Sequence, residues 1–147
     1  MTFTTTADVP AERARVFAAL VDPEVLRRCI PGCEELAALG DDTYQATLKI
    51  GVAGLKGSYV GKAELRDKQP PDSFTIRFDG KGGPGFVRGT AAIRLTGDAA
   101  TTHVTADADV QVGGLIAAVG SRLIEAAAKK LAVDFFRQLA DAVAARS

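Results

Sequence analysis

The hydrophobic pattern of this chain changes its period once, near residue 113. Between residues 44 and 112, apolar side chains recur at every second position, which is the period of a strand with one buried face. From Gly113 onward they recur every three or four positions, the period of an amphipathic helix. A sheet followed by one long helix must use that helix to cover its apolar face. The pattern therefore predicts an α+β fold in which an antiparallel sheet curves around a C-terminal helix.

Five stretches alternate in this way, and a looser alternation over Phe3–Val9 adds a strand near the N-terminus. Polar residues fill the opposite face, which is typical of antiparallel strands covered on one side only. Turn-forming residues separate the stretches. We expect six to seven strands, including Tyr44–Val52, Leu55–Leu65, Phe74–Phe78, Thr90–Thr96 and Val104–Val112.

Two short helices are predicted after the first strand. Pro10 suits the first turn of one helix, and Asp22 with Pro23 suits the start of the next. Pro31–Gly32 then ends the second helix. The C-terminal helix is predicted to run for about 30 residues, or roughly 45 Å at 1.5 Å per residue.

Length and composition favour one globular domain over residues 1–147. Hydrophobic residues make up 47% of the chain, and 18 basic residues balance 18 acidic ones. A formal net charge of zero argues against non-specific nucleic-acid binding, which depends on neutralising phosphates. The sequence shows neither a signal peptide nor a membrane span. We therefore expect a cytoplasmic protein with reduced cysteines.

The residues offer no catalytic or metal site. One histidine, His103, and two cysteines, Cys29 and Cys33, do not make a structural zinc set or a catalytic triad. The segment Lys81–Gly89 lacks the Gly-Lys-Ser/Thr ending of a phosphate loop. It fits either a flexible hairpin connection or a lid or partner-contact loop with Phe86 at its tip.

Small residues on the predicted inner face are more informative. Gly57, Gly61 and Ala63 lie on one strand, and Ala106 and Ala108 lie on another. They allow either close packing of sheet and helix or an apolar hollow that holds a flat hydrophobic molecule. Entry to such a hollow would lie between the short helices and Phe86. The residues predicted to bind the ligand are Leu26, Ile30, Tyr44, Leu48, Tyr59, Phe78, Phe86, Val119, Leu123 and Ala127. Phe135 is a further predicted lining residue.

Several segments resemble the carbon monoxide dehydrogenase G-subunit family, and the resemblance covers essentially the whole chain. That family belongs to the START and birch-pollen-allergen-like superfamily (SRPBCC), whose fold is called the helix-grip. The segments that carry the resemblance are Ile30–Glu34, Gly83–Gly89, Val112–Ala117, Val119–Ile124, Ala127–Leu131 and Phe135–Phe136.

The resemblance implies a carrier of a hydrophobic molecule, a quinone or a lipid, that serves a carbon monoxide dehydrogenase-type molybdenum hydroxylase. It implies no catalytic residues and no cofactor. It also implies peripheral contact with the inner face of the cell membrane. Some members have a C-terminal extension thought to reach the membrane. This sequence ends at Ser147, soon after the predicted helix, so we do not expect that anchor here.

Two other functions stay open at this point. The chain could be an assembly or membrane-recruitment subunit whose cavity is incidental. It could also be a small cyclase- or hydratase-like enzyme, because the superfamily includes such enzymes, although only Tyr44, Tyr59 and Arg94 offer polar groups for it. Homodimer formation is open as well.

Overall fold

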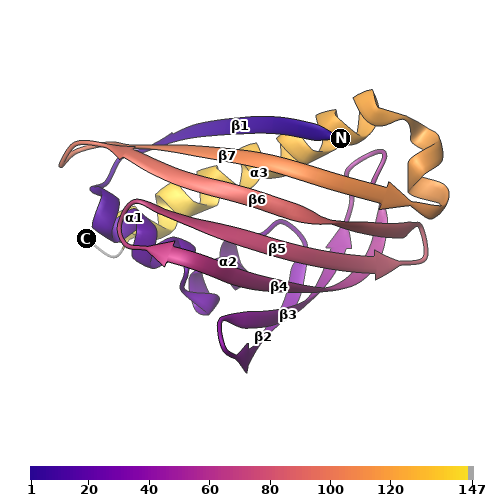
Figure 1. Ribbon diagram of the computed structural model, residues 1–147, viewed down its shortest axis with the longest axis horizontal. Coiled ribbons are helices and arrows are strands. Elements are labelled where there is room, and N and C mark those ends of the chain that lie inside the picture. The colour runs from indigo at the N-terminus through magenta and orange to yellow at the C-terminus, as the bar shows by residue number, and fades with distance from the viewer. Residues whose placement is uncertain (146–147) are drawn as a thin grey trace.

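The structure is a computed structural model that describes residues 1–145, and it confirms the predicted sheet and helix (Figure 1). Seven antiparallel strands form one sheet in the order β1-β7-β6-β5-β4-β3-β2. Residues 146 and 147 of the predicted domain lie outside the described residues. The elements are β1 (Thr2–Val9), α1 (Arg13–Leu20), α2 (Pro23–Cys29), β2 (Cys33–Gly40), β3 (Thr43–Ile50), β4 (Gly57–Gln69), β5 (Ser73–Gly82), β6 (Gly85–Gly97), β7 (Thr102–Gly113), the 3-10 helix η1 (Gly114–Val119) and α3 (Ser121–Ala145).

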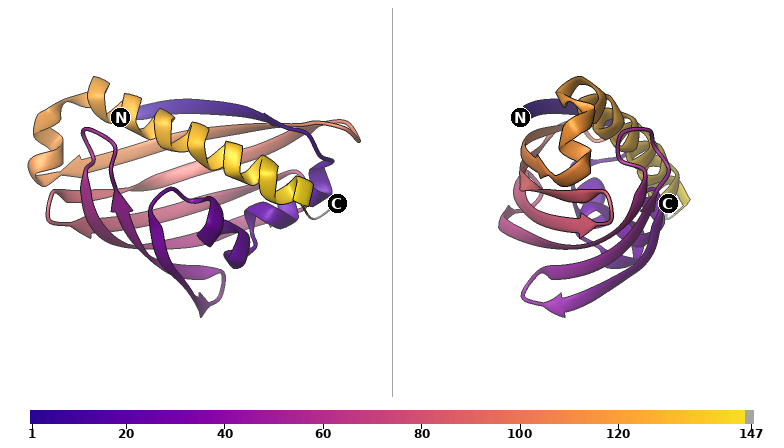
Figure 2. Two further views of the ribbon diagram at one scale, coloured as in Figure 1. Left: turned by 180° about the vertical axis from the view of Figure 1, so that it is seen from behind. Right: turned by 90° about the vertical axis from the view of Figure 1, so that its right-hand side faces the viewer.

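The sheet curls around α3, which crosses its concave face diagonally (Figure 2). The short helices α1 and α2 connect the two edge strands, β1 and β2, and close one end of the concave face. Helix α3 packs against α1, α2, β1 and η1, and its backbone does not approach any of the strands β2 to β7 as closely. The helix therefore covers the β1 side of the sheet closely and leaves the β2–β4 side less covered.

The apolar interior is divided into two clusters. The larger one joins α1, α2 and the C-terminal half of α3 to the sheet, and it includes Val16, Phe74 and Leu139. The smaller one lies at the opposite end of the sheet, where Tyr59 and Ile116 pack together. Residues of both clusters, such as Phe74 and Tyr59, border the hollow that lies between them.

Strand β2 was not predicted from the sequence. Its residues do not alternate between apolar and polar, and most of them are exposed, because β2 pairs only with β3 at the edge of the sheet. The turn residues at Gly40–Asp42 could have indicated β2, because a hairpin turn joins a strand before it to the strand after it.

The C-terminal helix is shorter than predicted. Its periodic segment is broken at Gly120, whose φ of +93° is left-handed and ends η1 before α3 begins at Ser121. The helix proper has 25 residues, not about 30.

Residues 85–89 do not form a loop. Strands β5 and β6 pair as far as Gly82 opposite Gly85, so only Gly83 and Pro84 remain in the connection. Phe86 therefore lies within β6, on the face opposite to its neighbour Val87. The hypothesis of a lid with Phe86 at its tip is wrong for this reason.

The contact between α3 and the larger cluster gives a stability prediction. Leu139 is fully buried, whereas Val133 on the same helix is 56% exposed. We expect Leu139→Ala to lower the free energy of unfolding by about 2–5 kcal/mol, because it leaves a cavity. Val133→Ala should change it by less than about 1 kcal/mol. Urea denaturation followed by circular dichroism measures both, and equal effects would contradict this account of the core.

Candidate functional site

A cavity of about 450 Å³ lies between the sheet and α3, within the range of about 300–1,000 Å³ typical of small-molecule sites. It is open to solvent on one side and is bordered by the sheet, α2 and the middle of α3. The lining residues are Leu20, Leu26, Ile30, Leu36, Tyr44, Ala46, Leu48, Ile50, Leu55, Tyr59, Gly61, Lys62, Ala63, Leu65, Phe74, Ile76, Phe78, Asp79, Gly80, Val87, Ile93, Leu131, Phe135 and Phe136.

The hollow exists because small residues meet in one row of the sheet. Ala46, Gly61, Gly80 and Val87 are direct partners on β3, β4, β5 and β6, so they share the concave face. Neither Gly61 nor Gly80 projects a side chain toward α3. The sequence allowed either close packing or a hollow at these small residues. The structure has a hollow, and Gly61 and Ala63 border it.

The cavity wall is almost entirely hydrocarbon. The hydroxyl of Tyr59 donates a hydrogen bond of 2.7 Å to the backbone oxygen of Leu55, so it is already satisfied within the protein. Burial raises the pKa of Tyr59 and keeps the phenol neutral. Lys62 and Asp79 are cross-strand partners whose side chains are exposed on the outer face of the sheet. They border the cavity because their neighbours Gly61 and Gly80 have no side chains to cover the backbone there. An apolar molecule would therefore meet no charged group inside.

Six of the ten residues predicted to bind a ligand border this cavity: Leu26, Ile30, Tyr44, Leu48, Tyr59 and Phe78. Phe135 borders it too. Whether they contact a ligand stays a prediction.

The other four predicted residues lie elsewhere. Phe86 is on the outer face, where the guanidinium of Arg88 sits 4.7 Å from its ring centroid. Val119 and Leu123 are 41% and 42% exposed at the end where η1 meets α3. Ala127 is buried without bordering the cavity. Val119 is the last residue of η1, so it lies before Gly120 and outside α3.

Several lining residues were missed by the sequence reasoning. Leu36 was missed because β2 was missed, and Gly80 because the predicted strand ended at Phe78, whereas β5 continues to Gly82. Leu131 stood on the predicted apolar side of the helix and could have been chosen from its spacing to Phe135.

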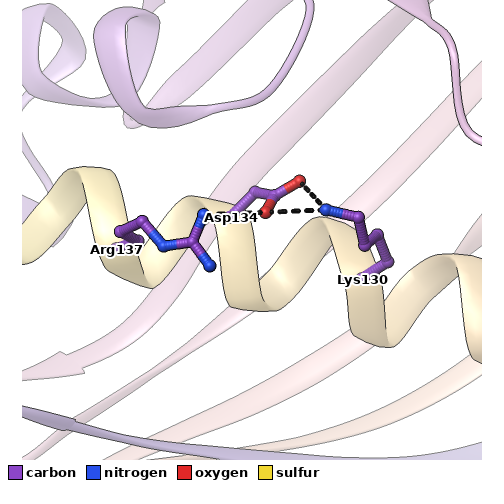
Figure 3. Close-up of polar contacts among 3 residues, drawn as sticks. All are labelled: Lys130, Asp134 and Arg137. Atoms are coloured by element: carbon purple, nitrogen blue, oxygen red, sulfur yellow. Dashed lines mark hydrogen bonds and ion pairs between the residues drawn. The ribbon is translucent and has the colours of Figure 1, made fainter.

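A second, polar pocket adjoins the first where α2 ends beside α3. Its lining residues are Arg27, Arg28, Cys29, Ile30, Pro31, Gly32, Cys33, Lys130, Asp134, Arg137 and Gln138. Figure 3 shows Asp134 between Lys130 and Arg137 on the outer side of α3. The Lys130 ammonium donates to both oxygens of Asp134 at 3.0 and 2.9 Å, and Arg137 lies 3.7 Å away. We call this hollow the basic pocket.

Metal and thiol chemistry find little support in the part of the chain that the structure describes. It contains no group of three or more residues placed to hold a metal ion. Cys29 and Cys33 are both free thiols, and burial raises the pKa of each. His103 is partly exposed and lies 2.7 Å from Asp8 across the β1–β7 pair. Within the same residues, no helix has the length and apolar character needed to span a membrane.

Solved structures place this arrangement in the START-like class of folds. A START superfamily protein from Mycobacterium smegmatis has a TM-score of 0.79 at 14% identity, with 99% of both chains covered. The Zhui aromatase/cyclase from a Streptomyces species has a TM-score of 0.72 at 17% identity, covering 99% of this chain and 94% of that one. A conserved protein from Geobacillus kaustophilus is more similar, with a TM-score of 0.94 at 35% identity over 98% of this chain and 95% of its own.

The sequence identifies the family within that class. Residues 6–144 match the family of the carbon monoxide dehydrogenase G-subunit (CoxG), and the chain belongs to it. This confirms the resemblance inferred from the sequence motifs. No curated protein matches the chain.

The row of small residues gives a direct test of the cavity. A β-carbon built on Gly80 would come no closer than 3.9 Å to any atom, so Gly80→Leu should enter the hollow without strain. We expect Gly80→Leu to weaken binding of the neutral dye Nile red about tenfold, through lost apolar contact. The unfolding temperature should stay the same or rise, because a void is filled.

The matched control is Gly51→Leu, at an exposed position with nothing within 4 Å of the added carbon. Fluorescence titration should show wild-type affinity for this control. Wild-type affinity in Gly80→Leu would mean that the dye binds outside the cavity.

Proposed function

We propose that this protein binds a hydrophobic small molecule, a quinone or a lipid, between the sheet and α3. In this proposal it acts as a non-catalytic carrier or accessory subunit of a carbon monoxide dehydrogenase-type molybdenum hydroxylase. The observation that supports binding most strongly is the half-open cavity of about 450 Å³ with its hydrocarbon wall. Membership of the CoxG family supports the choice of partner enzyme.

The size of the cavity is sufficient for useful affinity. Burying roughly 500 Å² of apolar ligand surface at about 25 cal/mol per Å² contributes about 12–13 kcal/mol, which an association cost of about 4–5 kcal/mol reduces to about 8 kcal/mol. A free energy of about 8 kcal/mol corresponds to a dissociation constant near 1 μM. A carrier needs an affinity of this order, because it must also release its ligand.

The polar groups of the cavity argue against catalysis as its main role. A general acid or base must reach the reacting group, directly or through one water. Of the two phenols, Tyr59 is bonded to Leu55, and the charged neighbours Lys62 and Asp79 face outward. Arg94, the other polar candidate from the sequence, lies on the outer face beside Asp107. These placements support binding over a cyclase or hydratase reaction, although one neighbour of similar fold is an aromatase/cyclase.

Uptake of a quinone tests the proposal. We expect native mass spectrometry to show one equivalent of a short-chain menaquinone, or of a neutral lipid such as methyl dodecanoate, retained by the wild-type protein. Ligand at 100 times its dissociation constant should raise the unfolding temperature by about 5–10 °C, because it stabilises the fold by about 2.7 kcal/mol. Gly80→Leu should retain less ligand, and Gly51→Leu should match the wild type. A wild-type protein that takes up neither compound would overturn the proposal.

Exposed apolar side chains at one end support a second role, peripheral membrane contact. Leu115, Val119 and Leu123 are 76%, 41% and 42% exposed where η1 joins α3, and the cation Arg122 stands beside them. Apolar residues that project next to a basic one suit the headgroup region of an anionic bilayer. Contact there would bring the protein to the source of a lipid or quinone.

Vesicle sedimentation tests this second role. We expect the wild-type protein to sediment with vesicles that contain 30% anionic phospholipid, and Leu115→Ser with Val119→Ser to reduce the bound fraction about fivefold or more, through lost apolar burial. The control is Val60→Ser, at a 49% exposed position on the outer face of β4. Equal sedimentation of both variants would contradict membrane contact through the end where η1 joins α3.

A further inference from the structure

We propose that the ligand is an amphiphile with an acidic head group, a carboxylate or a phosphate, and that the basic pocket holds this head group while the cavity holds the chain. This inference rests on the proposed binding function and, of the two ligand classes named there, selects an acidic lipid over a quinone. It assigns a role to side chains that the apolar cavity does not use.

The basic pocket carries an excess of positive charge. Arg27 and Arg28 come from the last turn of α2, and Lys130 and Arg137 come from the outer side of α3. Asp134 is the one carboxylate among the described lining residues, and Glu24, outside the lining, pairs with Arg27 at 2.7 Å. Four cations against these two anions leave two positive charges, on a chain whose formal net charge is zero.

The known structural roles of cations explain only part of this grouping. Basic residues in the last turn of a helix complement its dipole, which accounts for Arg27 and Arg28. On α3, Lys130 and Arg137 pair with Asp134 at i,i+4 and i,i+3 spacing, but this one carboxylate offsets only one of their two positive charges. Arg28 makes no close ion pair among residues 1–145, and its charge helps to lower the pKa of Glu24, which already pairs with Arg27. Burial raises the pKa of Cys29 and Cys33, so these thiols stay neutral and do not offset the cations.

The basic pocket and the cavity are neighbours. Ile30 borders both of them, so one side chain lies between the charged hollow and the apolar one. On α3, Lys130 and Asp134 precede the cavity residues Leu131 and Phe135 by one position each. Helix α3 thus presents cavity and pocket residues on adjoining sides over the same two turns.

The polarity of the cavity dictates where a head group must lie. A buried charge without a partner is costly, and the hydrocarbon wall offers none. An acidic head group therefore has to stay at the opening, where guanidinium groups can form charge-assisted hydrogen bonds with it. A neutral head group would not neutralise the positive charges of Arg28 and Arg137.

Displacement of Nile red by a matched pair of ligands tests the inference. Dodecanoate and methyl dodecanoate share one chain and differ in the charge of the head group. At low salt, we expect the wild-type protein to bind dodecanoate about tenfold more tightly than the ester, the change that one charge-assisted hydrogen bond produces. In Arg28→Gln with Arg137→Gln, the ratio should fall to about one to three, with ester affinity unchanged as a sign that the cavity is intact.

The control pair is Arg77→Gln with Arg94→Gln, both exposed on the outer face of the sheet. It removes the same charge and should keep the tenfold ratio. A ratio near one in the wild type, or the same ratio in both double variants, would overturn the inference while leaving the proposed function standing. Failure of both ligands and of Nile red to bind would overturn the proposed function itself.

A third arm separates an amphiphile from a free anion. Inorganic phosphate, titrated while the Gly32 amide is followed by NMR, should bind far more weakly than dodecanoate, because it lacks the chain. Binding of phosphate as tight as that of dodecanoate would make the basic pocket a separate anion site and overturn the link to the cavity.

Discussion

The structure depends on how one helix covers the concave face of a seven-stranded sheet. Helix α3 lies diagonally, so its backbone packs closely on the β1 side and does not approach strands β2 to β7 as closely (Figure 2). The apolar residues then gather into two clusters at opposite ends of the sheet. The cavity between them follows from this geometry together with the small residues Gly61 and Gly80.

The sheet, the long helix and the family could be predicted from the sequence, because each strand shows a period of two and the motifs extend along the chain. Strand β2 could not, because most residues of this edge strand are exposed and its sequence carries no alternating pattern. The helix was predicted too long because a 3-10 turn and an α-helix have similar periods, and only the positive φ of Gly120 separates them.

The candidate site could be predicted in part, for a related reason. Residues on regular strands, such as Tyr44 and Phe78, border the cavity because alternation fixes the face they occupy. Phe86 was misplaced because glycine-rich sequence looks like a loop although it forms a tight hairpin. The volume of the hollow could not be predicted, since it depends on the distance between α3 and the sheet. The basic pocket was missed because its cations come from segments about 100 residues apart.

The hollow depends on the small residues that line it more than on the fold itself. A larger side chain at Gly80 has room to enter the cavity, and Gly80 adopts ordinary backbone angles, so glycine is not required there by conformation. Filling such a space would normally add stability through dispersion contacts. Proteins tolerate lost packing chiefly where function needs it. The same reasoning applies to the charges, because four cations from two helices share only Asp134 and Glu24, and an added anion would reduce the remaining repulsion among them. An apolar cavity that adjoins a basic pocket is therefore the arrangement that an acidic amphiphile would match.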